Sequence, residues 1–305
     1  MAAIMINLIF ASMQQQRKAY LYAITTIFFW ATVGSAFKLS LRHLNYVQLV
    51  FYASFVSLCV IGLVLILQRQ TGLLRILNGK DIAYSALLGF FNPFIYYLVL
   101  LKAYSILQAQ EAVALNYTWP VLLVLLSIPM LRQPIGWKSI LAICISFFGT
   151  FIIATRGHIL DFRLTNPLGV GLALVSAGIW AFYWILNVKD KREEVSKLFL
   201  NFVFGFIYIL IYTQATGNFV IPDLKGFLGV TYIGFFEMGF TFIFWLKALK
   251  FSSTTAKVTN LIYIAPFLSL LIVSFVVGEK IMISTLTGLV FIVSGIIMQQ
   301  YSRTK

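Results

Sequence analysis

The sequence predicts an all-α integral membrane protein whose ten transmembrane helices form two inverted five-helix repeats. Three observations carry this prediction: the composition, a series of long apolar segments, and an internal repeat. Apolar residues make up 61% of the 305 residues, and charged residues only 10%. Soluble proteins carry about a quarter of their residues as charged side chains. The composition therefore excludes an ordinary soluble domain.

Ten apolar segments follow one another, separated by polar residues or by glycine and proline. The bilayer core is about 30 Å thick and needs about 20 residues of helix. Ten spans would use roughly 200 residues and leave only short connections. The predicted spans are 20–38, 46–67, 82–101, 109–131, 138–155, 168–188, 198–215, 226–247, 255–277 and 283–300.

Lysine and arginine are unevenly distributed between alternate connections. If both termini are cytoplasmic, 16 of them lie on the inside and 7 on the outside. Because cytoplasmic loops carry the excess of positive charge, we expect a multi-pass protein of the cell (inner or plasma) membrane with both termini in the cytoplasm. These flanking charges also account for the net charge of +14, so nucleic acid is not an expected partner. The apolar run at 4–10 is too short to span, and Met13 is an alternative start to Met1.

The two halves of the chain share a sequence pattern. Gly89-Phe90-Phe91 recurs as Gly234-Phe235-Phe236, at an offset of 145. Two further pairs keep an offset of 146, namely Pro120 with Pro266 and Gly149 with Gly295. The expected repeats are 18–157 and 158–305. Because each holds five spans, an odd number, the second copy must be inverted. Inverted repeats are typical of secondary transporters, with the substrate site near the midplane between the halves.

One acidic residue lies deep in a predicted span. Glu237 is about eleven residues into the eighth span, which is about 16 Å along a helix. A charge at that depth costs about 2.5–3.5 kcal/mol, so it is a functional candidate by default. We expect it to bind a substrate amine or to carry a proton. The alternative is a structural hydrogen bond to a serine, threonine or tyrosine on a neighbouring helix. Its repeat mate is Asn92, which is also polar.

Two further charges lie about one turn inside their spans. Glu111, in the fourth span, is either an acid at the mouth of the site or the ion-pair partner of Lys102 or Lys38. Lys257, in the ninth span, either attracts a substrate carboxylate at an inner gate or extends its amine back to the membrane surface. The sequence leaves both pairs of alternatives open.

Three prolines fall inside predicted spans. Pro93, Pro120 and Pro266 each remove a helical hydrogen bond and free a carbonyl oxygen. Free carbonyls at membrane depth are tolerated only where protein or a watered cavity satisfies them. We therefore expect these prolines to mark hinges and cavity lining, although proline is also common in membrane helices in general.

Several motifs resemble a known family. Gln108-Ala109-Gln110-Glu111-Ala112-Val113, followed by Asn116-Tyr117-Thr118-Trp119-Pro120, resembles the fourth-span motif of YddG-type aromatic amino-acid exporters. The stretch from Asn166 to Tyr183 is similar to their sixth span, and Gly278-Glu279-Lys280 resembles the signature that follows the ninth span of EamA proteins. From about residue 18 onward the chain thus resembles the drug/metabolite transporter superfamily with two tandem EamA domains. The resemblance implies the EamA fold, a central cavity lined by spans 1, 3, 4, 6, 8 and 9, and export of amino acids or related metabolites.

Aromatic and polar residues in those spans complete the candidate site. Trp180, Tyr183, Trp184 and Asn187 share one face of a helix. An aromatic cavity suits planar or cationic substrates through stacking and cation–π contacts. The expected substrate-binding residues are Trp30, Asn92, Tyr96, Glu111, Asn116, Trp119, Trp180, Trp184, Glu237 and Tyr263. The expected gating residues are Pro93, Pro120, Pro266 and Lys257.

Other functions have no support in the sequence. It contains no phosphate-binding loop for ATP-driven pumping. His43 and His158 stand alone, so no metal, cofactor or catalytic residue is expected. We expect a secondary transporter that exports aromatic or neutral amino acids by alternating access, as a monomer or homodimer, with protons as a candidate coupling ion. The alternatives are another solute class, such as a drug-like cation or a nucleotide sugar, and a non-transporting intramembrane enzyme or assembly factor.

Overall fold

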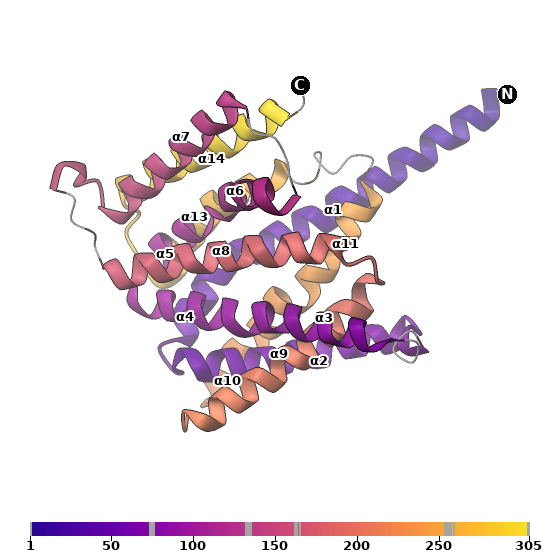
Figure 1. Cartoon of the computed structure of the whole chain (residues 1–305), viewed down its shortest axis with the longest axis horizontal. Coiled ribbons are helices and arrows are strands. Elements are labelled where there is room, and N and C mark those ends of the chain that lie inside the picture. The colour runs from indigo at the N-terminus through magenta and orange to yellow at the C-terminus, as the bar shows by residue number, and fades with distance from the viewer. Residues whose placement is uncertain are drawn as a thin grey trace.

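A computed structural model describes residues 2–72, 77–131, 136–161, 164, 166–252, 258 and 260–303. Within this part of the chain all regular secondary structure is helical. The helices run roughly side by side, and the first helix begins at the end of the bundle where the last one finishes (Figure 1). We call this end the terminal end. The other, which carries the turn at 41–45, is the distal end.

The first half of the chain supplies five spans, of which two are built from several helical pieces. These elements are α1 (Ala2–Ser40), α2 (Tyr46–Leu67), then α3 (Gly79–Gly89), η2 (Phe90–Ile95) and α4 (Tyr96–Ile106) as the third span, α5 (Ala109–Asn116) and α6 (Trp119–Leu131) as the fourth, and α7 (Trp137–Ala154). The short turn η3 (Ile159–Asp161) leads into the second half.

The second half repeats this plan. Its elements are α8 (Pro167–Lys189), α9 (Glu194–Ala215), then α10 (Leu224–Tyr232), η4 (Ile233–Phe240) and α11 (Thr241–Phe251) as the eighth span, η5 (Asn260–Ile264) and α13 (Ala265–Val277) as the ninth, and α14 (Ile283–Arg303). In the described part of the chain, eight helices are long and apolar enough to cross a membrane, and two shorter apolar helices complete the set. The predicted fold class is confirmed. The first helix starts much earlier than the predicted residue 20, at Ala2.

Short polar residues fix where several spans begin. Asn45 and Asn78 each cap the backbone N–H groups of the following helix, and a side chain three residues later completes a capping box. Asn166 and Asp223 each cap one backbone N–H group, at the start of α8 and α10. Such caps satisfy N–H groups that have no partner inside the helix. The connections can therefore stay short at the membrane boundary.

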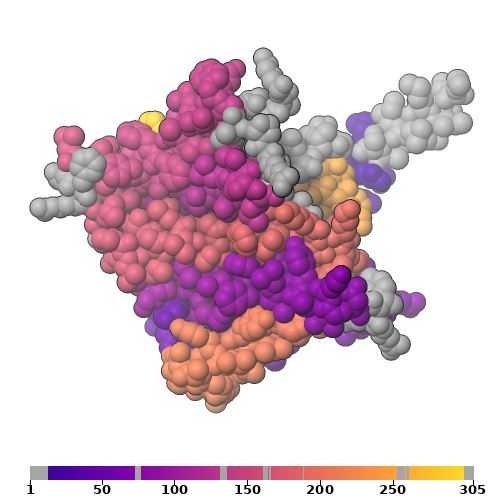
Figure 2. Space-filling model, viewed as in Figure 1, coloured from indigo at the N-terminus to yellow at the C-terminus, as the bar shows by residue number. Residues whose placement is uncertain are grey.

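The two halves exchange helices. α1, from the first half, packs against α11 and α13 of the second. In return, α8 packs against α4, α5 and α6, and runs between α4 and α6 in Figures 1 and 2. The pairs α2 with α9 and α7 with α14 join equivalent helices of the two halves. Every major contact thus has a counterpart in the other half, as two inverted repeats require.

The repeated glycines lie where helices cross most closely. A Cβ on Gly89 would collide with the backbone of Asn201 in α9, and a Cβ on Gly234 would lie 2.6 Å from the Ala53 carbonyl oxygen in α2. Gly149 of α7 likewise faces the backbone of α14. Only glycine permits this approach. The matching offsets in the sequence therefore reflect matching helix crossings.

The α-helical winding of the third and eighth spans is interrupted at equivalent positions in the two repeats. η4 is a π-helical turn, whereas η2 is a kink. Within η2, Asn92 has an extended backbone (φ −145°, ψ 121°) next to Pro93. The prolines of the fourth and ninth spans behave differently. α5 ends at Asn116, ahead of Pro120, and η5 precedes Pro266, so both prolines lie in the first turn of a new helix. Their role as hinges stays a prediction.

Candidate functional site

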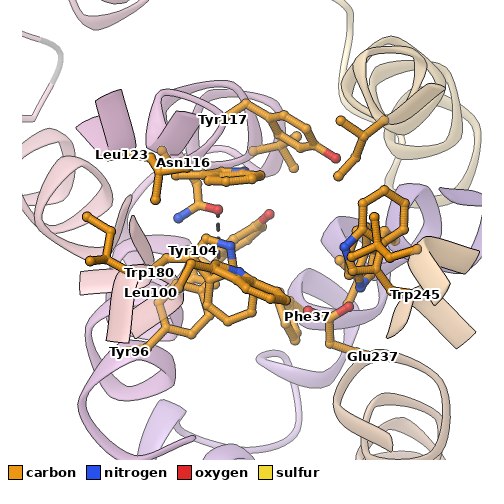
Figure 3. Close-up of a pocket in the computed structure, with 18 of the residues that line it drawn as sticks. Phe37, Tyr96, Leu100, Tyr104, Asn116, Tyr117, Leu123, Trp180, Glu237 and Trp245 are labelled. Atoms are coloured by element: carbon orange, nitrogen blue, oxygen red, sulfur yellow. Dashed lines mark hydrogen bonds between the residues drawn. The ribbon is translucent and has the colours of Figure 1, made fainter. Parts of the chain in front are cut away.

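A cavity of about 380 Å³ lies at the centre of the bundle, where the two halves meet. Its walls come from α1, α4, α5, α6 and α8, and from η4, α11 and η5 (Figure 3). Seven of the ten predicted substrate-binding residues line it: Trp30, Tyr96, Asn116, Trp119, Trp180, Trp184 and Glu237. The other three, Asn92, Glu111 and Tyr263, are not among the lining residues.

Aromatic rings form most of the cavity wall. The ring of Tyr96 on α4 stacks on Trp180 of α8, with 4.6 Å between centroids and 28° between planes. Trp184, one turn further along α8, meets Trp180 edge-on at 5.8 Å. On another wall Trp30 of α1 lies 5.4 Å from Trp245 of α11. These walls can hold a planar or cationic group by stacking.

Glu237 is the acidic group of the cavity. It lies in η4, is 8% exposed, and its Oε1 accepts a hydrogen bond of 3.2 Å from the Tyr97 hydroxyl. Its Oε2 has no hydrogen-bond partner in the described part of the chain. Among the described lining residues Glu237 is the one charged side chain. The carboxylate thus makes a structural hydrogen bond through one oxygen and can bind a ligand through the other.

Asn116 brings an amide to the cavity wall. Its Nδ2 donates to the Ser176 Oγ at 3.0 Å, which ties α5 to α8. Its Oδ1 accepts a longer contact of 3.5 Å from the Tyr96 hydroxyl. The kink between α5 and α6 leaves Asn116 as the last residue of α5, directly beside the aromatic wall (Figure 3). A polar substrate group can therefore meet an amide and a phenol here.

Glu111 forms an ion pair instead of lining the cavity. It is buried at the distal end, and Arg156 donates to it twice, from Nε at 2.8 Å and from Nη2 at 3.1 Å. This hydrogen bonding raises the pKa of Arg156. The predicted partners are wrong: Lys38 donates to the backbone carbonyls of α4's last turn, and Lys102 lies over the Tyr46 ring at 4.8 Å.

A network at the distal end joins both halves. Glu279, between α13 and α14, accepts hydrogen bonds from the backbone N–H groups of Ala109 (2.8 Å) and Gln110 (3.2 Å) at the start of α5. A carboxylate is favourable there because the N–H groups at a helix start are unpaired and partly positive. The Gln110 side chain in turn donates to the Lys280 carbonyl at 2.8 Å. We call this network the distal seal; its members are Lys38, Gln110, Glu111, Arg156 and Glu279.

The distal seal closes the cavity on that side. Phe37, Tyr104 and Leu107, which lie between the cavity and the seal, are 1–3% exposed. Towards the terminal end the lining is less buried, since Trp119 and Trp184 are only partly covered. The predicted gating residue Lys257 lies outside the described residues.

The backbone explains why Asn92 and Tyr263 miss the cavity. The extended backbone at Asn92 turns its side chain towards α8 and α9, where it lies fully buried beside the Tyr183 hydroxyl and Asn201. Tyr263 belongs to the 3₁₀ turn η5, whose tighter winding brings Ile262 to the cavity in its place. Neither the repeat offset that suggested Asn92 nor the choice of span that suggested Tyr263 takes account of this irregular winding.

Four further aromatic residues line the cavity but were not among the predicted site residues. They are Phe37, Tyr104, Tyr117 and Trp245. Trp245 lies eight residues after Glu237, which is about 80° round a regular helix. The wider π-helical turn of η4 reduces that rotation and brings both to the same cavity. The repeat gives no signal for Trp245 as an aromatic lining residue, because the residue at the equivalent position 145 residues earlier is Leu100.

Comparison with known proteins gives one consistent result. The sequence profile of the EamA-like transporter family matches residues 17–155 and 167–299. An "Uncharacterized transporter" of Clostridium kluyveri is 25% identical over 304 residues, which is 95% of each chain. Another, of Archaeoglobus fulgidus, is 21% identical over 92% of this chain and 97% of its own.

A solved structure has the same fold. A crystal structure whose title names no function matches 94% of this chain and 98% of its own, with a TM-score of 0.64 and 20% identity. At this identity the likeness concerns the fold alone.

Proposed function

The chain belongs to the EamA-like transporter family, and from this premise we propose that it exports small amine-bearing metabolites across the cell membrane. Aromatic and neutral amino acids are the favoured substrates, moved by alternating access as a secondary transporter with both termini in the cytoplasm. The observation that carries the proposal is Glu237, with one unpartnered carboxylate oxygen in an aromatic cavity.

The cavity matches an aromatic amine in chemistry and in size. A substrate ammonium would pair with the free Oε2 of Glu237, and a ring would stack against Trp180 or Trp30. A volume of about 380 Å³ is in the range of small-molecule pockets. Burial strengthens such a pair, because a charge inside the membrane finds no water to replace its partner.

Alternating access gives the distal seal a role as a gate. In the described conformation the seal closes one end of the cavity through hydrogen bonds among five side chains and nearby backbone groups. Release on that side would require these bonds to break. The exchanged helices α1 and α8 would then move relative to the half that each contacts, as expected for inverted repeats that rock about a central site.

A second candidate substrate is an organic cation without a carboxylate. No lysine, arginine or histidine is present among the described lining residues. A zwitterionic amino acid would thus have only uncharged donors for its carboxylate, such as the Asn116 amide, hydroxyl groups and indole N–H groups. An amine such as phenethylamine would need none of them. The lack of a basic lining residue favours organic cations, because an amino acid would bring a carboxylate that no basic side chain neutralises.

Counterflow in proteoliposomes tests both candidates. Vesicles holding the purified full chain would be loaded with unlabelled phenylalanine, tryptophan, phenethylamine or tryptamine, and uptake of the labelled compound measured with and without a pH gradient. We expect saturable counterflow of at least one of the two amino acids and of the amine that corresponds to it. Glu237→Gln should lower the affinity about tenfold or more, because a charge-assisted hydrogen bond is worth roughly 1.5–3 kcal/mol.

A matched control uses Glu194→Gln, which removes an acid from the first turn of α9, away from the cavity. It should leave counterflow unchanged. Stronger counterflow of the amines than of the amino acids would favour the second candidate. An absence of flux for all four compounds, with the protein folded, would contradict the proposal and favour a different solute or a non-transporting role.

A further inference from the structure

A second hollow lies at the side of the bundle, separate from the central cavity. It has a volume of about 570 Å³ and lies at the distal end, with α1 as its floor and α10 and α13 as its walls. Leu228 of α10 and Val276 of α13 line it and are 59% and 52% exposed. We call it the lateral groove. Since exposed apolar residues of a membrane helix face lipid, the groove opens towards the bilayer.

Basic side chains surround the mouth of the lateral groove. Arg42 and His43 lie in the turn that follows α1, and Lys225 lies in the first turn of α10. All three are exposed. The Nη2 of Arg42 lies 3.4 Å from the Val277 carbonyl, which keeps the guanidinium near the end of α13. These residues stand where the spans end, at the level of lipid headgroups.

The acidic neighbour of Lys225 and His43 at the mouth is already engaged. Asp223 lies 2.9 Å from the His43 Nδ1 and accepts a hydrogen bond of 2.7 Å from the Gly226 N–H. These contacts hold the pKa of the Asp223 carboxyl below its usual value, chiefly through the backbone hydrogen bond. Lys225 makes no hydrogen bond with the described part of the chain, so Arg42 and Lys225 both present free positive charge to the mouth.

The floor of the groove carries hydroxyl groups. Ser35 is 3% exposed, lines the groove, and its Oγ has no hydrogen-bond partner in the described residues. Thr32 lies one turn deeper and is hydrogen-bonded to the Tyr232 hydroxyl at 2.6 Å. On a helix Ser35 lies about 10 Å below Arg42. Several buried hydroxyls of the described residues lack a partner, and Ser35 is the one among them that lines the groove.

We propose that the lateral groove binds an anionic phospholipid. Its phosphate would lie between Arg42 and Lys225, and an ester carbonyl would accept a hydrogen bond from Ser35. One acyl chain would follow the apolar walls past Leu228 and Val276. A free phosphate could satisfy the basic mouth, but it would leave the apolar walls and the buried hydroxyl without a partner. Basic pockets between membrane helices bind lipid headgroups on the cytoplasmic or matrix side of membranes, and the lateral groove offers the same chemistry at the distal end.

A lipid in the lateral groove would contact helices that also carry residues of the central cavity. α1 forms its floor and also lines the central cavity through Trp30 and Phe37. α10 forms a wall and continues directly into η4, which carries Glu237. A lipid bound to both helices would link two elements that come from different halves of the chain. The proposal stands independently of the transported substrate.

Native mass spectrometry of the purified full chain tests the proposal. The protein would be exposed to phosphatidylglycerol or phosphatidylcholine with the same acyl chains. We expect phosphatidylglycerol to be retained about tenfold or more above phosphatidylcholine, and the double variant Arg42→Gln/Lys225→Gln to lose this preference. Lys80→Gln is the matched control, because Lys80 is an exposed lysine in the first turn of α3 at the terminal end. It should leave retention unchanged.

Two further measurements separate the lipid from other occupants. Leu228→Ser changes an exposed groove residue, so the fold should survive, and it should lower phosphatidylglycerol retention several-fold without changing the charge. Excess inorganic phosphate should not displace the lipid. Equal retention of both lipids by the wild type, full retention by the double variant, or displacement by inorganic phosphate would each overturn the proposal.

Discussion

The third and eighth spans are interrupted at equivalent positions but in different ways. η4 winds as a π-helix, whereas η2 is a kink at Asn92 and Pro93. Both spans have a glycine just before or within the interruption, Gly89 and Gly234, against which another helix packs. The shared feature is thus the close crossing rather than the proline. The side chains have diverged on this common frame: Glu237 faces the cavity, whereas its repeat mate Asn92 is buried against α8 and α9.

The largest expected effect is a loss of substrate affinity on substitution of Glu237 but not of Asn92. Glu237→Gln should weaken binding of the substrate amine about tenfold or more. Asn92→Ala should change affinity less than threefold, because Asn92 does not reach the cavity, and it should act on thermal stability instead. Substrate affinity from counterflow and the melting temperature in detergent would be measured for both variants. Equal losses of substrate affinity in the two variants would contradict the different positions of Glu237 and Asn92.

The next prediction concerns the crossings. Gly89→Ala and Gly234→Ala should each destabilise the protein by about 1–3 kcal/mol, because the added methyl group meets the backbone of the neighbouring helix. Gly171→Ala is the control: this glycine of α8 has nothing within 4 Å of an added Cβ. It should be neutral or slightly stabilising. Denaturation in detergent measures all three. A tolerated Gly234→Ala would mean that the eighth span is widened for another reason.

A smaller effect is expected at the distal seal. Arg156→Gln removes the partner of the buried carboxylate of Glu111. Since Arg156 itself is 37% exposed, the loss should be about 1–2 kcal/mol, below that of a fully buried pair. A cysteine placed at Gln108 should then react faster with a water-soluble maleimide. Unchanged labelling would argue that the backbone caps made by Glu279 close this end without the ion pair.

The ion pair at the terminal end should show the smallest effect. Burial alone would raise the pKa of Asp190, but hydrogen bonds from Arg192 outweigh it and lower this pKa below the usual value. A carboxyl whose pKa is lowered by folding stabilises the protein above its unfolded pKa of 3.8 and loses this contribution as the pH falls through the folded value. Asp190→Asn should therefore remove about 1 kcal/mol at neutral pH.

The same variant should make stability less dependent on pH below about 4, measured by melting temperature across pH. By the same reasoning Arg156, whose pKa is raised, should add no pH dependence between pH 5 and 9, since it stays charged throughout. A wild-type stability that does not change down to pH 3 would contradict the role of Asp190.

Sequence alone identified the fold and seven of the residues that line the cavity because membrane proteins obey strong local rules. Apolar segments must be helical, and a carboxylate such as Glu237 needs a reason to be in hydrocarbon. Prediction from the sequence failed where contacts with distant parts of the chain decide the position of a side chain. Glu111 pairs with Arg156, 45 residues away, and no spacing rule selects that partner. Asn92 was expected in the cavity as the repeat mate of Glu237, and Tyr263 because its span was expected to line the cavity, but both lie on segments whose winding is irregular.

The exchange of α1 and α8 between the halves has a consequence for biogenesis. α1 is synthesised first, yet α11 and α13, its main neighbours, are among the last elements to leave the ribosome. The amino-terminal half therefore lacks the surface that covers its own first helix, whereas many multidomain proteins complete one domain before the next is made. Assembly of the bundle must wait for nearly the whole chain. During synthesis α1 must therefore stay in the bilayer without its main partners until α11 and α13 have been inserted.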